Sequence, residues 1–326
     1  MPSPSPQVTL TTLRPDLQPF FDINYDLLAS QFVGLQVFPV TETGVQSGIY
    51  PEIPLGEQLR HTQTGARTNG AGYWRDVASF TTGSFATQEY GFEELVDYRA
   101  ARQYANYLQA ELFAVQRSLN KLLTRQEMRI AAKFDTTAYT AAGMVQAKSA
   151  GQWDAAGSKP LDDVEAAVRK VYDASGIWPN ALVISQKTFR SLRLNAQVQD
   201  AIRAAGAGFP TRAEDVTTQM LSAVFALPKI IVGGGSKNTA APGATPAISQ
   251  IWPNNAIVAV VAETQDFSEP CVGRSFHWGE DGSMVRGAVE SYEEPQNRAT
   301  VVRCRHDVDE KLLYLKLACM ILTVVT

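Results

Sequence analysis

The chain has 326 residues, 45% of them apolar, and a net charge of −4. This composition can bury a sizeable core, so it excludes disorder for most of the chain and predicts two lobes or one large discontinuous domain. Because Lys and Arg are interspersed with Asp and Glu, the charge pattern excludes a protein that wraps nucleic acid electrostatically and leaves only local or indirect contact with DNA.

Residues 1–45 are rich in proline and poor in charge. They predict an extended arm that lies on a neighbouring molecule, with at most a short helix over residues 24–32. Residues 46–90 combine recurring glycines with short alternating runs, which predicts a long two-stranded hairpin. A hairpin of this size has only itself to pack on, so we expect it to be mobile unless a partner covers it.

The segment from Glu93 to Phe134 lacks glycine and proline and predicts a long helical spine. Its apolar residues recur at helical steps, which places them on one buried stripe. A second interpretation is two helices with a break between Asn120 and Thr124, since Thr124 and Glu127 fit a capping box. The stripe consists of Leu95, Tyr98, Ala105, Leu108, Leu112, Val115, Leu119 and Leu122.

The remaining residues alternate between helix and strand patterns. A helix is predicted from Leu161 to Ala174, with acidic residues in its first turns, Gly176 beyond its end, and Val164, Val168, Val171 and Tyr172 on its buried face. The later elements are a strand over 181–184, a helix capped by Ser185, a helical face over 219–225, strands over 229–232 and 256–262, a loop over 233–245, and antiparallel strands over 285–292, 299–305 and 312–325. This order predicts an α+β architecture.

The sequence offers no clear catalytic or metal site. His61, His277 and His306 lie near no nucleophile motif and are interpreted as solvated or structural. The glycine runs at 70–72 and 233–235 lack the residues that complete nucleotide-binding loops and are interpreted as turns. An acidic cluster near the C-terminus lacks the compact spacing of a calcium loop, so solvated strand ends are the favoured interpretation. It consists of Glu290, Glu293, Glu294, Asp307, Asp309 and Glu310.

The cysteines and the termini likewise show no pattern typical of a disulfide framework, a zinc site, a signal peptide or a membrane span. Cys271, Cys304 and Cys319 are far apart, which predicts buried free thiols rather than disulfides or a zinc site. The N-terminus lacks the regions of a signal peptide, and the longest apolar run, 317–325, is too short to span a bilayer. We therefore expect no enzyme activity, no cofactor and no metal, in a soluble protein made in the cytoplasm.

Aromatic and basic residues gather on the predicted hairpin. They could stack on bases, but apolar residues on a protruding hairpin more often mark a protein interface, which is the interpretation we favour. The candidate intersubunit contacts are Arg60, Arg67, Tyr73, Trp74, Arg75, Phe80 and Phe85.

The order of arm, hairpin, spine helix, α/β lobe and returning strands resembles the major capsid protein of tailed bacteriophages, with the Hong Kong ninety-seven type fold. Three strings carry the resemblance: DVEAAVRKVYDASGIWPNALVISQKTFRSLRLNAQVQDAIR, LSAVFALPKIIVGGGSKNTA and SQIWPNNAIVAVVAE. The resemblance implies an N-terminal arm (1–45), an extended loop (46–90), a peripheral domain with the spine helix (91–175 and 285–326) and an axial domain (176–284).

The resemblance also implies a function. The chain would self-assemble into pentamers and hexamers of an icosahedral phage head that encloses double-stranded DNA without sequence-specific binding. Its implied partners are a separate scaffolding protein, a portal and, as an optional addition, a cement protein. An encapsulin-type nanocompartment shell has the same fold and stays an alternative, as does a soluble hydrolase with a disordered N-terminus. A mildly acidic wall suits a container, because a strongly basic wall would hinder DNA packing and release.

Overall fold

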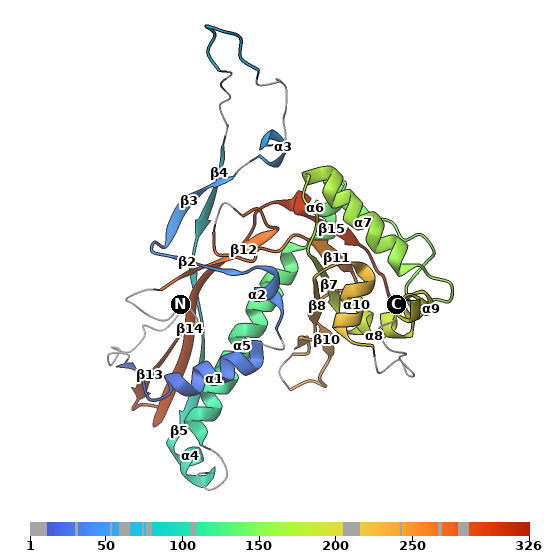
Figure 1. The fold of residues 1–326 in the computed structure, drawn as a ribbon. Coiled ribbons are helices and arrows are strands. Elements are labelled where there is room, and N and C mark those ends of the chain that lie inside the picture. The colour runs from blue at the N-terminus through green and yellow to red at the C-terminus, as the bar shows by residue number, and fades with distance from the viewer. Residues whose placement is uncertain are drawn as a thin grey trace.

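The computed structural model describes residues 12–29, 32–52, 54–58, 66–73, 75, 80–104, 109–204, 216–241, 243–266, 269–279 and 287–326. Two β-sheets lie on either side of the long helix α5 (Ala110–Lys133), as Figure 1 shows. The predicted α+β architecture is confirmed. No described helix is both long enough and apolar enough to cross a membrane.

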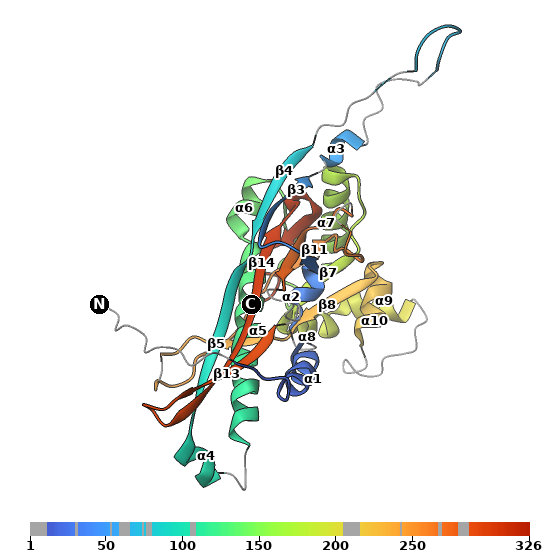
Figure 2. The same cartoon turned by 90° about the vertical axis from the view of Figure 1, so that its left-hand side faces the viewer.

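The first sheet is built around one long strand, β14 (Ala299–Leu312). β5 pairs with β14 over residues 88–97 along one edge, and β13 followed by β12 pairs along the other edge. β14 and β5 run side by side over much of the length of the molecule (Figure 2). The other strands of this sheet are β1 (Thr12–Leu13), β2 (Val40–Thr43), β5 (Gln88–Asp97), β12 (Gly273–Trp278) and β13 (Ala288–Glu294).

The second sheet has five strands and lies beneath helix α7 (Pro160–Ser175). Its central strands β7 and β11 are fully buried, as their continuous apolar runs predict. In order, the strands are β6 (Val145–Gln146), β15 (Ala318–Ile321), β11 (Ala256–Ala259), β7 (Ala181–Ser185) and β8 (Lys229–Gly233). The helices of this lobe are α6 (Thr136–Ala141), α8 (Gln186–Leu194), α9 (Ala196–Ala204) and α10 (Thr218–Phe225), with a 3-10 turn at Leu315–Leu317.

Helix α5 is continuous, so the alternative of a break between Asn120 and Thr124 is wrong. Leu119 and Leu122 are fully buried against the first sheet, and Ile130 lies in the core of the second lobe. The spine therefore joins two hydrophobic cores. Ala105 and Leu108 lie outside the described residues.

The prediction that the helix begins at Glu93 is also wrong. Residues 93–97 belong to β5, where every second side chain faces inward, and Leu95 is 51% exposed. Asp97 ends the strand and starts the short helix α4 (Tyr98–Tyr104), because its carboxylate accepts hydrogen bonds from the Arg99 and Ala100 amides at 2.8 and 2.9 Å.

The predicted capping residue Glu127 caps a different helix. It is buried in the middle of α5, and its carboxylate accepts the amide N–H groups of Val33 (3.1 Å) and Gly34 (2.6 Å) at the start of α2 (Gly34–Val37). The indole N–H of Trp252 also donates to this carboxylate. Burial raises the pKa of Glu127, and the three N–H donors oppose that shift.

Much of the N-terminal segment packs within its own subunit, so the prediction of an arm without a core of its own is wrong for these residues. Phe21 and Tyr25 of α1 (Gln18–Ala29) are buried against α5, and Val37 and Phe38 enter the main core. α1 is also longer than the short helix expected at 24–32. The reason is tertiary: Phe21 and Tyr25 join one apolar cluster with side chains of α5 and of the first sheet.

The helix predicted at 161–174 is confirmed, and Gly176 ends it with φ 74°, a left-handed conformation that favours glycine. Its predicted buried face is wrong at one position, because Tyr172 is 39% exposed and stacks on the exposed ring of Trp178 with centroids 4.1 Å apart. The predicted loop at 233–245 contains strand β9 (Ser236–Asn238), which pairs with β10 (Ile248–Gln250).

Candidate assembly surfaces

The predicted hairpin is confirmed as a two-stranded ribbon. β3 (Ser47–Glu52) pairs antiparallel with β4 (Thr81–Ala86), and the described residues 66–73 lie beyond it, away from both lobes (Figures 1 and 2). The short helix α3 (Leu55–Gln58) follows β3. On the ribbon, Ile49 is 74% exposed and Phe80 is 60% exposed. These apolar side chains have no cover within the described subunit and are available to another molecule.

The base of the hairpin is anchored, which corrects the expectation that the hairpin has only itself to pack on. Tyr50 and Phe85 are buried on the ring of Phe276 from β12, with Phe85 stacked at a centroid distance of 4.6 Å. Burial raises the pKa of Tyr50 to about 12. Gly83 lies directly opposite Tyr50 and has no room for a side chain. The first sheet thus fixes the direction in which the hairpin leaves the subunit.

The candidate contact residues fall into three groups. Tyr73 is 72% exposed and lies under the guanidinium of Arg67, 5.2 Å from the ring centroid; Arg75 and Phe80 are also exposed. Phe85 is buried inside the subunit, so its assignment as an intersubunit contact is wrong. Arg60 and Trp74 lie outside the described residues, as does His61.

His277 and His306 lie in a buried layer between α5 and the first sheet. The rings of His277 and His306 are 6.1 Å apart, and Gln126 of α5 lies 3.4 Å from His277. The Nε2 of His306 has no hydrogen-bond partner among the described residues. Burial, the neighbouring His277 and Arg129 hold the pKa of His306 well below its ordinary value. Both rings are buried, which agrees with the structural and not with the solvated interpretation of these histidines.

Half of the acidic cluster is buried, so solvated strand ends are the wrong interpretation for Glu290, Asp307 and Glu310. The physical reason is that arginines pair with them. Arg129 of α5 makes a two-pronged ion pair with Glu310 at 2.7 and 2.9 Å, and Arg305 contacts Glu290 at 2.8 Å. Among the described residues, no group of three or more His, Cys, Asp or Glu side chains is placed to hold a metal ion.

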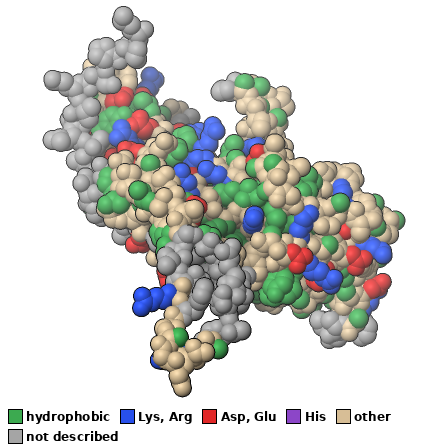
Figure 3. Space-filling view, turned by 90° about the horizontal axis from the view of Figure 1, so that it is seen from above, with side chains coloured by type: hydrophobic (Ala, Val, Ile, Leu, Met, Phe, Trp, Pro, Cys, Tyr) green, Lys and Arg blue, Asp and Glu red, His purple; other side chains and the backbone are tan. Residues whose placement is uncertain are grey.

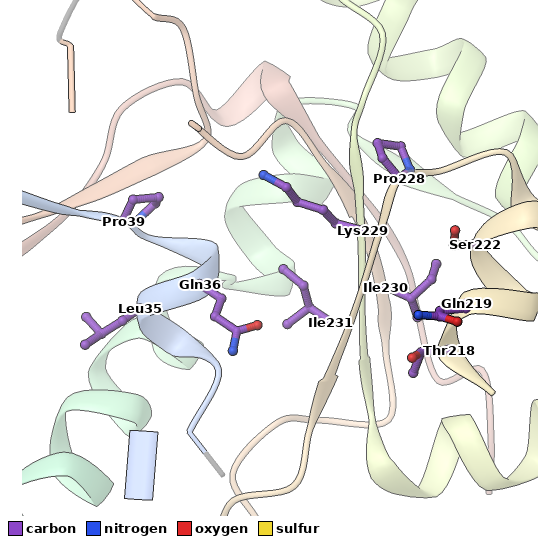
Figure 4. Close-up of a pocket in the computed structure, with 10 residues that line it drawn as sticks. All are labelled: Leu35, Gln36, Pro39, Thr218, Gln219, Ser222, Pro228, Lys229, Ile230 and Ile231. Atoms are coloured by element: carbon purple, nitrogen blue, oxygen red, sulfur yellow. The ribbon is translucent and has the colours of Figure 1, made fainter. Parts of the chain in front are cut away.

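A cleft of about 490 Å³ separates α2 from β8 and α10 (Figure 4). Aliphatic, amide and hydroxyl side chains line it, together with Lys229. None of the described residues that line it is a histidine, cysteine or carboxylate. The residues are Leu35, Gln36, Pro39, Thr218, Gln219, Ser222, Pro228, Lys229, Ile230 and Ile231.

The three cysteines are buried free thiols, as predicted. Burial raises the pKa of Cys304 to about 12 and that of Cys319 to about 11, so neither is a reactive thiolate at neutral pH.

Comparison with known proteins places this geometry in a fold class. No protein-family model matches the chain. A curated relative, the major capsid protein of Burkholderia phage BcepMu, is 23% identical over 205 residues, a match that spans 63% of this chain and 64% of that relative's length.

Solved structures match over far more of the chain. A phage-related protein from Bordetella bronchiseptica RB50 superposes with a TM-score of 0.68 at 19% identity, covering 97% of this chain and 98% of its own. A putative capsid protein of an Escherichia coli CFT073 prophage gives 0.56 at 10% identity, covering 96% and 99%. The SrpI encapsulin of Synechococcus elongatus gives 0.52 at 11% identity, covering 90% and 88%. The chain therefore has the tailed-phage capsid fold of the Hong Kong ninety-seven type.

Proposed function

We propose that the chain is the major capsid protein of a tailed bacteriophage. It assembles into pentamers and hexamers of an icosahedral head that encloses double-stranded DNA. The observation that carries this proposal is the match of nearly the whole chain to the phage-related fold, together with the similarity to the BcepMu major capsid protein. The protein acts by assembly and not by catalysis, and its place is the virion.

The β3–β4 hairpin supports assembly. Its base is fixed by Phe276; Ile49 is exposed at this base, and Tyr73 and Phe80 are exposed farther along the hairpin. Burying such apolar area in a neighbour is favourable by roughly 25 cal/mol per Å², and the fixed base limits the ordering entropy that docking costs. We propose that the hairpin lies on an adjacent subunit and that Tyr73, Phe80, Arg67 and Arg75 contribute to that contact.

The surface charge suits a container. In Figure 3, acidic and basic side chains are interspersed on the face in view, with no large field of one sign. Such a wall neither repels packed DNA strongly nor holds it in place.

We also propose a peripheral domain around the first sheet and an axial domain around the second. The boundaries at residues 175 and 285 stay a prediction; by sheet membership, β12 goes with the first sheet and β15 with the second.

The test is electron microscopy of the expressed full-length chain beside a variant in which residues 55–80 are replaced by a short Gly/Ser turn. We expect closed shells from the native chain and a folded, unassembled subunit from the variant. The matched control is Ile23→Ser, an exposed apolar residue on α1 away from the hairpin, which we expect to assemble. Normal shells from the hairpin variant would refute its role, and a native chain that stays a small oligomer both alone and with a scaffolding protein present would refute the proposal.

The similarity to the SrpI encapsulin supports one second candidate, a protein-filled nanocompartment. The contents of particles purified from the native source separate the two. A phage head holds nuclease-protected double-stranded DNA, whereas a nanocompartment holds a second protein as its cargo.

A further inference from the structure

The exposed face of the spine helix carries a basic cleft that neither the fold comparison nor the proposed assembly explains. The cleft has a volume of about 740 Å³ and lies between α5, Phe92 of β5 and strand β9. Four cations line it, and none of the described residues that line it is acidic. Its lining residues are Phe92, Arg117, Asn120, Lys121, Thr124, Arg125, Met128, Ser236, Lys237, Asn238 and Thr239.

The cations are regularly spaced. Arg117, Lys121 and Arg125 follow each other at four-residue steps, so they lie on one side of α5 at intervals of roughly 6 Å along the axis. Lys237 adds a fourth positive charge from β9. An even row of charges matches a ligand whose own charges repeat along a line, and not a single small anion.

Among the residues that the structure describes, one carboxylate offsets this row. Glu94 of β5 contacts Arg117 at 2.7 Å and Lys121 at 3.2 Å, and its side chain is only 20% exposed. No ion pair joins Arg125 or Lys237 to a described residue. Four cations and one carboxylate leave a net charge of about +3 at the cleft, on a chain whose overall charge is −4.

The neutral lining residues favour phosphate. Asn120, Thr124, Ser236, Asn238 and Thr239 are amides and hydroxyls, which together with Arg and Lys are the side chains that contact phosphate oxygens in protein–DNA complexes. The side-chain oxygen of Asn238 already accepts two backbone N–H groups, so its amide N–H₂ group is oriented for donation. An acidic protein segment would instead need apolar anchor pockets, and only Phe92 and Met128 supply apolar surface here.

We propose that this cleft, the spine cleft, binds the sugar–phosphate backbone of double-stranded DNA without reading its sequence. The inference rests on the proposed function, because a phage head supplies DNA at high concentration. About three net charges per subunit give a weak, salt-sensitive contact that repeats over the shell. It positions the DNA layer next to the wall without stopping its release.

The experiment measures binding of the unassembled full-length chain to a fluorescent DNA duplex by anisotropy at several salt concentrations. Neutralising about three phosphates lowers the affinity about 40-fold between about 50 and 200 mM salt. The cleft variant is Lys121→Gln, Arg125→Gln and Lys237→Gln, which leaves Arg117 paired with Glu94; we expect its affinity to change less than about 3-fold over this range. In the single variant Arg125→Gln the DNA affinity should fall about 12-fold over the same salt range, and in Arg125→Lys it should again fall about 40-fold.

The matched control removes the same net charge elsewhere, by Arg169→Gln, Arg190→Gln and Arg203→Gln on exposed positions of α7, α8 and α9. It should behave as the native chain. Equal losses in the cleft and control variants would overturn the proposal, because overall charge would then explain binding. Displacement of DNA by polyglutamate at lower concentration than by unlabelled duplex would also overturn it, in favour of an acidic protein partner. Shell formation is scored separately by microscopy, so a native chain that forms shells but does not bind DNA refutes only the spine cleft.

Discussion

The buried carboxylate of Glu127 gives the sharpest test of how the lobes are held together. It is 2% exposed and receives three N–H donors, from Val33, Gly34 and Trp252. In Glu127→Gln the single amide oxygen can still serve Val33 and Trp252, which share Oε1. The new N–H₂ group then faces the amide of Gly34, whose partner Oε2 lies at 2.6 Å in the native chain.

Two facing donors leave at least one buried N–H without a partner, and an unpaired buried donor costs about 1 to 3 kcal/mol. We expect Glu127→Gln to lower the free energy of unfolding by that amount. Glu127→Ala leaves all three donors unpaired and opens a cavity, so its loss should be larger. The matched control is Glu165→Gln, an exposed carboxylate on α7 whose loss should stay within about 0.5 kcal/mol.

The assay is urea unfolding of the unassembled subunit, followed by circular dichroism. Trp252→Phe in the Glu127→Gln background completes a double-mutant cycle, and we expect a coupling of at least about 0.5 kcal/mol between the two residues. A stability equal to that of the native chain in Glu127→Gln, with zero coupling to Trp252, would refute the assignment of this carboxylate as the cap of α2.

Three further predictions concern the core, pH and covalent chemistry. Leu119→Ala should lower the free energy of unfolding by about 2 to 5 kcal/mol, and Leu119→Asp should abolish folding. Leu194→Ala, at a site that is 71% exposed, should be tolerated. Unchanged thermal stability in the aspartate variant would contradict the burial of Leu119. Because the folded-state pKa of His306 lies below its unfolded value, the unfolded chain binds the proton first. The free energy of unfolding should therefore fall as the pH drops below about 6.5, by at most about 1.4 kcal/mol per pH unit, and less steeply in His306→Leu. Parallel curves of stability against pH for the two proteins would refute this. Since no lysine precedes Lys121, the hairpin has no side-chain amine that could form a covalent cross-link to a neighbouring subunit. Mature particles boiled in detergent with reductant should therefore run on a gel as one band at 35.6 kDa. A ladder of multiples of this mass that survives the treatment would contradict the prediction.

Local signals in the sequence were sufficient for several elements. The helix at 160–175 could be predicted because its acidic first turn and its terminal glycine act within the element itself. The buried strand at 181–185 followed from a continuous apolar run, and Ser185 does cap the next helix by accepting the Thr188 amide. The hairpin followed from glycine-rich bends between alternating runs. The composition also showed that the chain as a whole is not basic, since net charge depends on composition alone.

Tertiary structure decided the features that depend on distant partners. Residues 93–97 fit a helical stripe, yet this segment is a strand because ten residues of β14 offer it a hydrogen-bonding edge. The local signal that marks the start of the helix is the N-cap residue Asp97. Phe85 is exposed in an isolated hairpin but buried once β12 places Phe276 against it. Glu127 fits a local capping box, but its carboxylate binds amides 93 and 94 residues away. In each case, the segment's own preference was outweighed by contacts that form only when distant parts of the chain come together.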